Sequence, residues 1–259
     1  MTASSAQLLR SDEGGIATLT LNRPEAYNAL SVELLCALQD AFDAITVDDR
    51  VRVVVLAANG KAFSAGHDLK EMRANPGRQA MGALFDQCSA VMLTMIRMPQ
   101  PVIARVHGLA TAAGCQLVAT CDLAVAAEEA RFATSGIKVG LFCATPMVAL
   151  TRNLPAKQAM EMLMTGEFVD ARQALAFGLV NRVVAADGLD GAVADLATAI
   201  AAKSPAAVAH GKRLFYRQLE AGLEQAYAWA GETMTENMMT GDAREGIDAF
   251  LGKGHRAKR

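Results

Sequence analysis

The first half of the chain alternates short apolar runs with stretches of helical periodicity. Residues 16–21 (IATLTL), 51–57 (VRVVVLA), 102–106 (VIARV) and 123–126 (LAVA) have the β-branched and aliphatic composition of strands. The run 51–57 is almost continuously apolar, as expected of a strand that is covered on both faces. Strands that alternate with helices predict an α/β body.

Helical spacing fills the intervals between these strands. Ser31 has the place and chemistry of an N-cap for a helix over residues 32–45. Residues 81–98 carry apolar side chains at intervals of three and four until two prolines end the pattern, and residues 112–119 form a small-residue helix. Each helix follows a strand, so the chain is predicted to repeat strand–turn–helix units.

From about residue 155 the pattern becomes helical, with almost no strand between the helices. The last helices keep methionine and aromatic side chains at helical spacing: Tyr227, Trp229, Met234, Met238 and Met239. Such positions favour burial against a partner subunit. We therefore expect an α/β core over residues 1–200 and a helical C-terminal region over residues 201–259.

Composition and charge exclude several classes of protein. Hydrophobic residues make up 52% of the 259 positions and charged residues 20%, which is typical of a globular protein. The formal net charge of −2 supplies no field for a polyanion, so no nucleic-acid partner is expected. No apolar run reaches the roughly 18 residues of a membrane helix, and the start MTASSAQLLR lacks signal-peptide features, so we expect a cytoplasmic protein without membrane association. The five cysteines include no CxxC pair, which predicts reduced thiols and no metal site.

Two glycine-containing loops carry the candidate chemistry. Residues 63–72 (FSAGHDLKEM) follow the strand at 51–57, and residues 108–117 (GLATAAGCQL) follow the strand at 102–106. Small side chains let a ligand approach the backbone, and free N–H groups at the start of a helix face whatever binds there. If the fold brings two such loops together, they form an oxyanion hole.

The order of these motifs resembles the crotonase superfamily, the enoyl-CoA hydratase/isomerase family. The resemblance rests on NRPEAYNALS, KAFSAGHDLKEM, HGLATAAGCQL with CDLAVAAEEARF, and the helical tail, and it covers about residues 12–253. FSAGHDLKEM and FATSGIKVGLFCATP resemble more narrowly the branch called enoyl-CoA hydratase domain-containing protein 3. The resemblance implies the crotonase fold, an α/β spiral core of repeated ββα units with a helical C-terminal trimerisation region.

For the site, the resemblance implies an acyl-CoA substrate, no permanently bound cofactor, and an oxyanion hole made by the backbone N–H groups of His67 and Ala113. These donors would polarise the thioester carbonyl and stabilise an enolate. The family often has glycine where Ala113 stands, and alanine fits there if its φ is negative. The His67 side chain has two open interpretations: a contact near the thioester, or a loop histidine that points away.

Both glutamates of the family's hydratases are missing. The position of the first is Gln116 and that of the second aligns with Gly136. Glutamine can orient water but cannot accept a proton, and glycine can do neither. The resemblance names a nominal hydratase or isomerase, whereas these two positions make efficient hydration doubtful and leave a non-catalytic acyl-CoA-binding protein as the alternative.

A third possibility is thioester hydrolysis that involves Cys143. This residue falls where some relatives carry a functional aspartate. A thiolate there would act as base or nucleophile only if its pKa were lowered, and a buried cysteine is ordinarily a small hydrophobic residue.

Coenzyme contacts are also implied by the resemblance. In this chain they fall on Arg23, Ala26, Ala65, Gly66, Asp68, Leu69 and Lys70, with Phe250 and Lys253 contributed by a neighbouring subunit. Glu25 stands where the family often has lysine, which puts the affinity for phosphate in doubt. The expected assembly is a homotrimer or a dimer of trimers.

Overall fold

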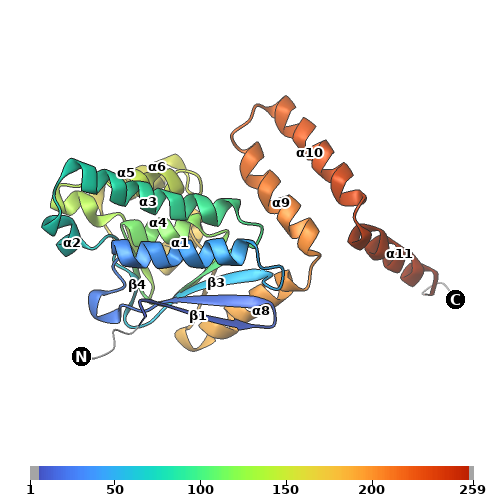
Figure 1. The fold of residues 1–259 in the computed structure, drawn as a ribbon, viewed down its shortest axis with the longest axis horizontal. Coiled ribbons are helices and arrows are strands. Elements are labelled where there is room, and N and C mark those ends of the chain that lie inside the picture. Colours follow the sequence, from blue (N-terminus) through green and yellow to red (C-terminus); the bar gives the residue numbers. More distant parts are fainter. Residues whose placement is uncertain (1–5, 257–259) are drawn as a thin grey trace.

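The computed structural model describes residues 6–256 and contains two sheets (Figure 1). The larger has the order β1-β2-β3-β5-β7-β10 and the smaller the order β4-β6-β8-β9. The strands are β1 (Leu8–Glu13), β2 (Ile16–Leu21), β3 (Val53–Ala58), β4 (Ala62–Ser64), β5 (Val102–Val106), β6 (Leu109–Thr111), β7 (Leu123–Ala127), β8 (Arg131–Ala133), β9 (Val169–Asp170) and β10 (Arg182–Val184). Pairing is parallel except for β1 with β2 and β8 with β9.

Helices connect the strands and continue beyond them. They are α1 (Val32–Thr46), α2 (Leu69–Ala74), α3 (Arg78–Arg97), α4 (Ala113–Thr120), α5 (Ala144–Leu150), α6 (Ala156–Thr165), α7 (Ala171–Phe177), α8 (Leu189–Ala201), α9 (Pro205–Gln218), α10 (Leu223–Met238) and α11 (Gly241–Arg256), with short 3-10 turns at Pro24–Ala26, Ser135–Val139 and Ala186–Gly188. The Ser31 side chain accepts the N–H of Leu34 and so caps α1, as its position in the sequence predicts.

The chain passes repeatedly from the larger sheet to the smaller one and then into a helix. The pairs β3–β4, β5–β6 and β7–β8 each place their first strand in the larger sheet and their second in the smaller. This confirms the repeated ββα units and the crotonase fold. Because each turn of the spiral ends at the same edge of the smaller sheet, the loops after β4 and β6 are brought side by side.

Side chains that alternate along the larger sheet supply two cores. Leu56 and Ala104 point into the main core, which α1, α3 and α4 cover, whereas Val55 and Ile103 point to the opposite face, which α8 covers. The central strands are therefore buried on both faces, as the apolar run at 51–57 predicts.

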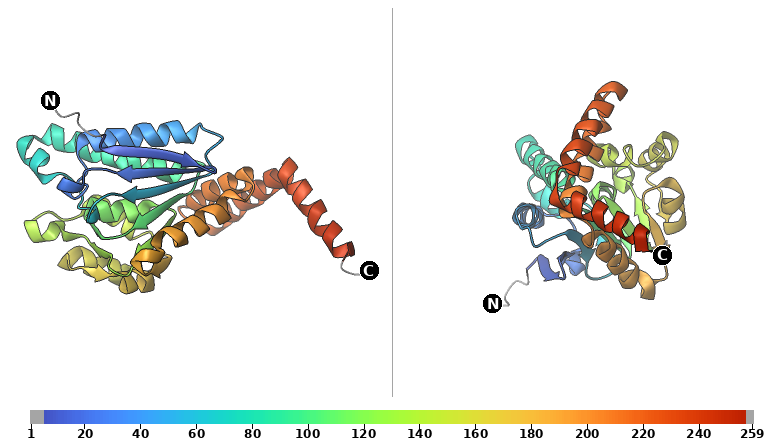
Figure 2. Two further views of the ribbon diagram at one scale, coloured as in Figure 1. Left: turned by 90° about the horizontal axis from the view of Figure 1, so that it is seen from below. Right: turned by 90° about the vertical axis from the view of Figure 1, so that its right-hand side faces the viewer.

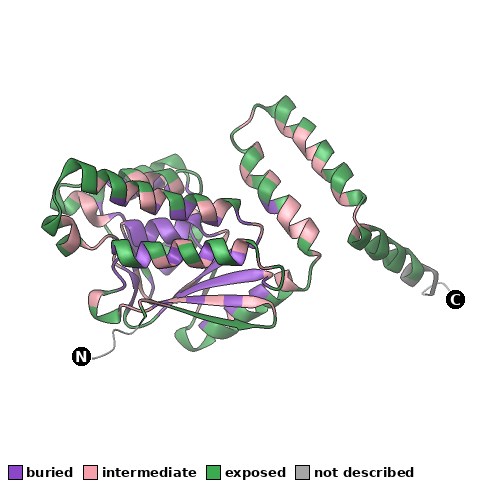
Figure 3. Cartoon of the chain, in the orientation of Figure 1, coloured by how far each residue is buried: buried purple, intermediate pink, exposed green. Residues whose placement is uncertain are grey.

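Helices α9, α10 and α11 extend away from the layered core (Figures 1 and 2). Helix α10 has no buried residue, and Figure 3 shows its surface as exposed or intermediate along its length. Tyr227 is 72% exposed and Phe250, on α11, is 79% exposed. Large apolar side chains at such exposure mark a surface that is suited to another protein chain.

Within residues 6–256, no single helix is both long and apolar enough to cross a bilayer. The segment Ala186–Ala201 and α9 meet the criteria of length and composition only as a pair, which is bent by 104°.

Candidate active site

The two glycine loops predicted from the sequence lie in contact. A Cβ atom placed on Gly66 would lie 3.1 Å from the backbone nitrogen of Ala113 and 2.8 Å from Cβ of Ala112. A Cβ atom placed on Gly114 would lie 2.3 Å from the carbonyl oxygen of Ser64. Since real Cβ atoms do not approach so closely, both glycines are required for the loops to touch, and the contact places the donors of the two loops together.

The two backbone N–H groups predicted as oxyanion-hole donors have no hydrogen-bond partner among the described residues. Ala113 is the first residue of α4, so its N–H has no partner inside the helix. Leu30 pairs with His67 in an isolated parallel bridge, in which the bonds run from Leu30 N–H to the Gly66 carbonyl and from Asp68 N–H to the Leu30 carbonyl. Backbone N–H groups alternate in direction along extended chain, so the His67 N–H points away from Leu30. Both groups are available to a ligand oxygen.

A brace that the sequence analysis did not identify holds the first loop. Asn28 is fully buried and its Nδ2 donates to the carbonyl oxygens of Asn59 and Ala62, both at 2.8 Å. The Ser64 hydroxyl donates to the carbonyl of Asn28 at 2.9 Å and accepts the N–H of Gly66 at 3.2 Å. This chain of bonds fixes the backbone one residue before the His67 donor. In the sequence, Asn28 stands in the mixed polar and apolar segment 22–31 (NRPEAYNALS), so its residue type alone gives no signal of this role.

The backbone is strained at Ala112, the residue before the predicted donor Ala113. Ala112 has φ 51° and ψ −121°, a conformation that favours glycine. Its N–H donates to the carbonyl of Ala133 at 2.9 Å, which ties the strained residue to strand β8. Ala113 itself is helical, so the condition for alanine at the donor position is met, and the strain falls one residue earlier.

Gln116 lies one turn into α4, three positions after Ala113. Its side chain is almost completely buried, at 4% exposure, and its Oε1 atom has no hydrogen-bond partner among the described residues. Residues three apart lie on one face of a helix, and helical side chains lean toward the N-terminus. Gln116 therefore lies on the face of α4 that also carries Ala113.

The second position aligned with a family glutamate has no room for one. A Cβ atom placed on Gly136 would lie 2.5 Å from the carbonyl oxygen of Leu141 and 2.9 Å from Sγ of Cys143. The Gly136 carbonyl in turn accepts the N–H of Leu141 at 2.9 Å. The segment that follows Gly136 is folded back over it, so the site lacks the acid and also the space for its side chain.

Burial holds Cys143 and His67 in their neutral forms. Burial raises the pKa of the Cys143 thiol, and the nearby Gly136 backbone opposes only part of that shift. Burial likewise lowers the pKa of His67, with a smaller opposing effect from the Leu30 backbone. Neither ring nitrogen of His67 has a full hydrogen bond among the described residues, and the ring packs edge-on against Phe85 with centroids 5.5 Å apart. Both side chains are therefore neutral at physiological pH.

The comparison with known protein families settles the membership of the chain. Residues 11–257 match the model of the enoyl-CoA hydratase/isomerase family. The chain belongs to this family.

Relatives within the enoyl-CoA hydratase/isomerase family include a Xenopus laevis protein named enoyl-CoA hydratase domain-containing protein 3, mitochondrial. It is 45% identical over 241 residues, which cover 93% of this chain and 82% of that protein. A crystal structure of human enoyl Coenzyme A hydratase domain-containing protein 3 matches with a TM-score of 0.93 at 43% identity, over 95% of this chain and 98% of that one. These matches confirm the resemblance to that branch.

A second solved structure, a Mycobacterium smegmatis protein titled enoyl-CoA hydratase, has a TM-score of 0.94 at 61% identity. The match covers 95% of this chain and 96% of that one. Family membership and the crotonase fold are thereby shown.

The segments that the family resemblance assigns to the coenzyme also lie together. Ala65 donates its N–H to the carbonyl of Tyr27 at 3.0 Å, so the turn containing Ala26 is beside the loop of Gly66. Arg23 is already engaged: its Nη1 donates to the carbonyl of Ala29 at 2.6 Å and its Nη2 lies 3.1 Å from Oδ2 of Asp68. As a phosphate ligand, Arg23 would have to keep or exchange these bonds.

The remaining predicted coenzyme residues differ in their surroundings. Asp68 caps α2 by accepting the N–H groups of Lys70 and Glu71, as a residue at its position does in many helices. Leu69 and Lys70 are exposed beside this cap. Phe250 lies on the projecting α11, and the side chain of Lys253 lies outside the described residues.

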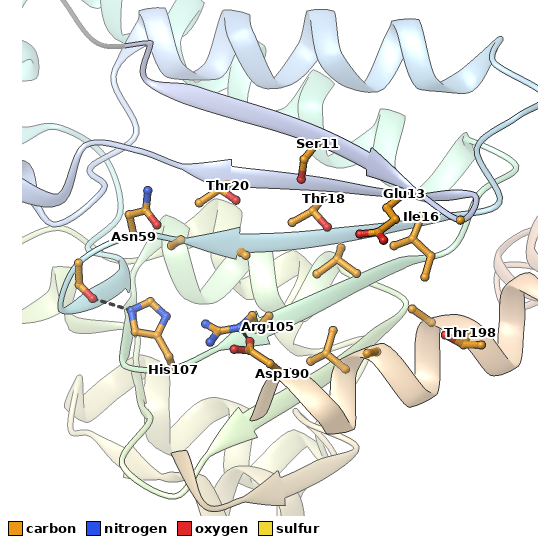
Figure 4. A pocket seen from close by; sticks show the side chains of 18 residues that line it. Ser11, Glu13, Ile16, Thr18, Thr20, Asn59, Arg105, His107, Asp190 and Thr198 are labelled. Atoms are coloured by element: carbon orange, nitrogen blue, oxygen red, sulfur yellow. Dashed lines mark hydrogen bonds and ion pairs between the residues drawn. The ribbon is translucent and has the colours of Figure 1, made fainter. Parts of the chain in front are cut away.

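A hollow lies on the other side of the main sheet, between the face of the sheet that α8 covers and α8 itself (Figure 4). Its volume is about 870 Å³, and its polar lining includes Arg105, paired with Asp190, and His107, whose Nε2 lies 2.9 Å from the carbonyl of Gly60. None of the predicted site residues lines it. Because Ala113 and the Gly66 loop belong to the opposite side, this hollow is separate from the candidate active site.

No group of three potential metal ligands occurs among the described residues.

Proposed function

We propose that this chain binds acyl-CoA thioesters and holds the thioester carbonyl oxygen between the backbone N–H groups of His67 and Ala113. The observation that carries the proposal is the contact of Gly66 with the first turn of α4, which brings these donors together. Preorganised N–H donors stabilise the negative charge that develops on an enolate oxygen, because they need no reorganisation when the charge forms.

Efficient hydration is not part of this proposal. Adding water across a double bond needs a base for the water and an acid for the neighbouring carbon, and each such group typically contributes 10²–10⁴-fold in rate. Gln116 has no titratable proton, and the Leu141 carbonyl occupies the space next to Gly136. A reaction through the enolate that does not use these acids is compatible with the site.

A second candidate is a non-catalytic acyl-CoA-binding protein. Gln116 and Gly136 favour it, because neither residue can transfer a proton. The proposed oxyanion-hole donors and the coenzyme segments do not depend on these two side chains. Thioester hydrolysis by Cys143 has weaker support, since burial raises the pKa of the thiol and keeps it protonated.

For the assembly we propose a homotrimer or a dimer of trimers. The exposed apolar side chains of α10 and α11, including Tyr227 and Phe250, would then be covered by neighbouring subunits. Sedimentation equilibrium tests this, and a monomer at micromolar concentration would contradict it.

The test of the site uses ligands that differ only at the carbonyl. Calorimetry compares an acyl-CoA with its thioether analogue, in which a methylene replaces the thioester C=O. We expect the thioester to bind about 10-fold more tightly, because only it can accept the two N–H groups. Equal affinities would contradict the oxyanion hole. Replacement of the Ala112–Ala113 amide by an ester removes one donor without changing a side chain and should abolish the difference, whereas Ala113→Gly keeps the N–H and should preserve it.

A further inference from the structure

We infer that the chain has a second ligand site, at the junction of α8 and α9, which binds a small and mostly apolar molecule that carries one neutral hydroxyl group. The acceptor of this hydroxyl group is the side-chain oxygen of Gln100. None of the residues that line the junction belongs to the candidate active site, so the second site is independent of the proposed acyl-CoA site.

The junction encloses a hollow of about 230 Å³. The segment Ala186–Ala201 and α9 meet there at a bend of 104°. The helices contribute a wall of apolar side chains: Ile200, Pro205, Val208 and Ala209. On the core side, Arg52 lines the hollow and its Nη2 donates to the carbonyl of Lys203, in the turn between the two helices. The hollow therefore lies between the core and the beginning of α9.

A buried acceptor at this hollow lacks a donor. Gln100, which lines the hollow, is 6% exposed, and its Nε2 donates to the carbonyl of Ile45 at 2.8 Å. Because that carbonyl only accepts, this bond fixes which end of the amide carries the nitrogen. The backbone carbonyl of Gln100 accepts from Nζ of Lys212 at 2.9 Å, whereas Oε1 has no hydrogen-bond partner within residues 6–256.

An unpaired oxygen of this kind is suited to a donor that arrives with a ligand. Buried polar atoms in folded proteins nearly always have partners, because an unpaired one loses its hydration without compensation. A buried water ordinarily makes about three hydrogen bonds, and the four apolar side chains of the helical wall offer none. The ligand therefore has to supply both the donor and the apolar surface that fills the hollow.

The surroundings of Oε1 decide the chemistry of this ligand. Carboxylates and ketones bring acceptors only and leave Oε1 unpaired. An ammonium group would lose its hydration against the apolar wall without gaining a counter-charge from Gln100. A neutral hydroxyl group on an apolar body avoids both costs, and it matches the usual small-molecule site, in which apolar walls surround a few polar groups.

The experiment measures the binding of 4-fluorophenol and 4-fluorotoluene by fluorine NMR titration. The two probes have nearly the same shape, and only the phenol has a donor proton. We expect both to bind the wild-type protein. In Gln100→Met, which keeps the length of the side chain without its polar atoms, the affinity of the phenol relative to that of the toluene should fall about 10-fold, because no acceptor remains for the hydroxyl proton.

A second variant tests the place of the site and leaves Gln100 unchanged. Ala209→Leu puts a larger side chain into the hollow and should abolish the binding of both probes. The matched control is Ala202→Leu, because Ala202 is exposed and does not line the hollow. Binding to this control should equal binding to the wild-type protein.

Three outcomes would overturn the inference. The first is that neither probe binds the wild-type protein, and the second is that Ala209→Leu binds them as the wild-type protein does. The third is an unchanged ratio of the two affinities in Gln100→Met, which would mean that Oε1 is not the acceptor. Each result is separate from a failure of the proposed function, because the oxyanion hole is tested with acyl-CoA ligands and their thioether analogues.

Discussion

The Nζ atom of Lys212 lies 2.7 Å from Oδ2 of Asp122, and this pair fastens α9 to the core. Nζ also donates to the carbonyl oxygens of Met95 at 2.7 Å and Gln100 at 2.9 Å, so all three of its protons are used. Burial lowers the pKa of Lys212, and the charge of Asp122 opposes the shift. Helix α9, which leads to α10 and α11, is therefore anchored near its middle by a buried ammonium group whose hydrogen bonds are all made.

Lys212→Met should destabilise the protein by about 3–5 kcal/mol, because it leaves the carboxylate of Asp122 without its cation. Asp122 keeps the N–H of Val102 and the hydroxyl of Tyr216 as donors, which do not replace a charge. The free energy of unfolding in urea, measured at one fixed protein concentration, tests this. The exposed Lys203→Met is the matched control, with an expected change within about 0.5 kcal/mol. A loss below 1 kcal/mol for Lys212→Met would contradict the role of the pair.

Ala112→Gly should stabilise the protein by about 1 kcal/mol. Glycine relieves roughly 1–3 kcal/mol of strain at the positive φ of Ala112 and costs about 0.5–1 kcal/mol of chain entropy. The control is Ala119→Gly within the same helix α4, where glycine is expected to cost about 1 kcal/mol. If both variants lose stability by the same amount, Ala112 is not strained.

The sequence predicted the elements whose signals are local. Ser31 caps the helix that its position indicates, and the strand Val102–Val106 has the predicted bounds. Strand β1 was not predicted, because LLRSDE is mostly exposed and owes its extended form to pairing with β2.

Within the site, the sequence located the loops but not what holds them in place. The strain at Ala112 and the turn that brings the Leu141 carbonyl against Gly136 depend on backbone torsions, which residue types alone do not reveal. The family resemblance supplied the donors His67 and Ala113, and composition could not have done so. The unpaired Oε1 of Gln116 is likewise visible only in the folded chain.

The free energy of unfolding should decrease as the pH falls below about 6.5, because the unfolded chain then takes up a proton at His67 more readily than the folded protein does. Burial lowers the pKa of His67 in the folded state, so between the folded and unfolded pKa values the unfolded chain binds more protons, and acid favours unfolding. This contribution is fully present above the unfolded pKa and is lost as the pH falls toward the folded pKa. His67→Gln should reduce the difference between the free energies of unfolding measured at about pH 7.5 and at about pH 5.5. These two values lie on either side of the unperturbed histidine pKa. The remaining slope includes His107, whose pKa burial also lowers.

Cys143 should react slowly with iodoacetamide at neutral pH. The reactive species is the thiolate, and burial raises the pKa of this thiol. The exposed Cys36 provides the internal comparison, and peptide mass spectrometry measures both sites in one sample. We expect Cys36 to be alkylated first and Cys143→Ala to leave any release of CoA from an acyl-CoA unchanged. Preferential alkylation of Cys143, together with loss of CoA release in Cys143→Ala, would instead support thioester hydrolysis.

A glutamate introduced at position 116 should restore enoyl-CoA hydration, whereas one introduced at position 136 should not. Gln116→Glu places a carboxylate on the helix face of the Ala113 donor, where it can activate water, so enoyl-CoA hydration should rise by about 10²-fold over the wild-type protein. Gly136→Glu should give no such gain, because its Cβ would lie 2.5 Å from the Leu141 carbonyl and the segment would have to move. We expect this variant to lose about 1–3 kcal/mol of stability, as overpacked sites do.

The double variant should therefore be no faster than Gln116→Glu alone. The loss of enoyl absorbance measures the rates, and the free energy of unfolding measures the cost of each change. A large gain that required both glutamates would show that the segment over Gly136 opens readily, and it would contradict the closed geometry of this wall of the site.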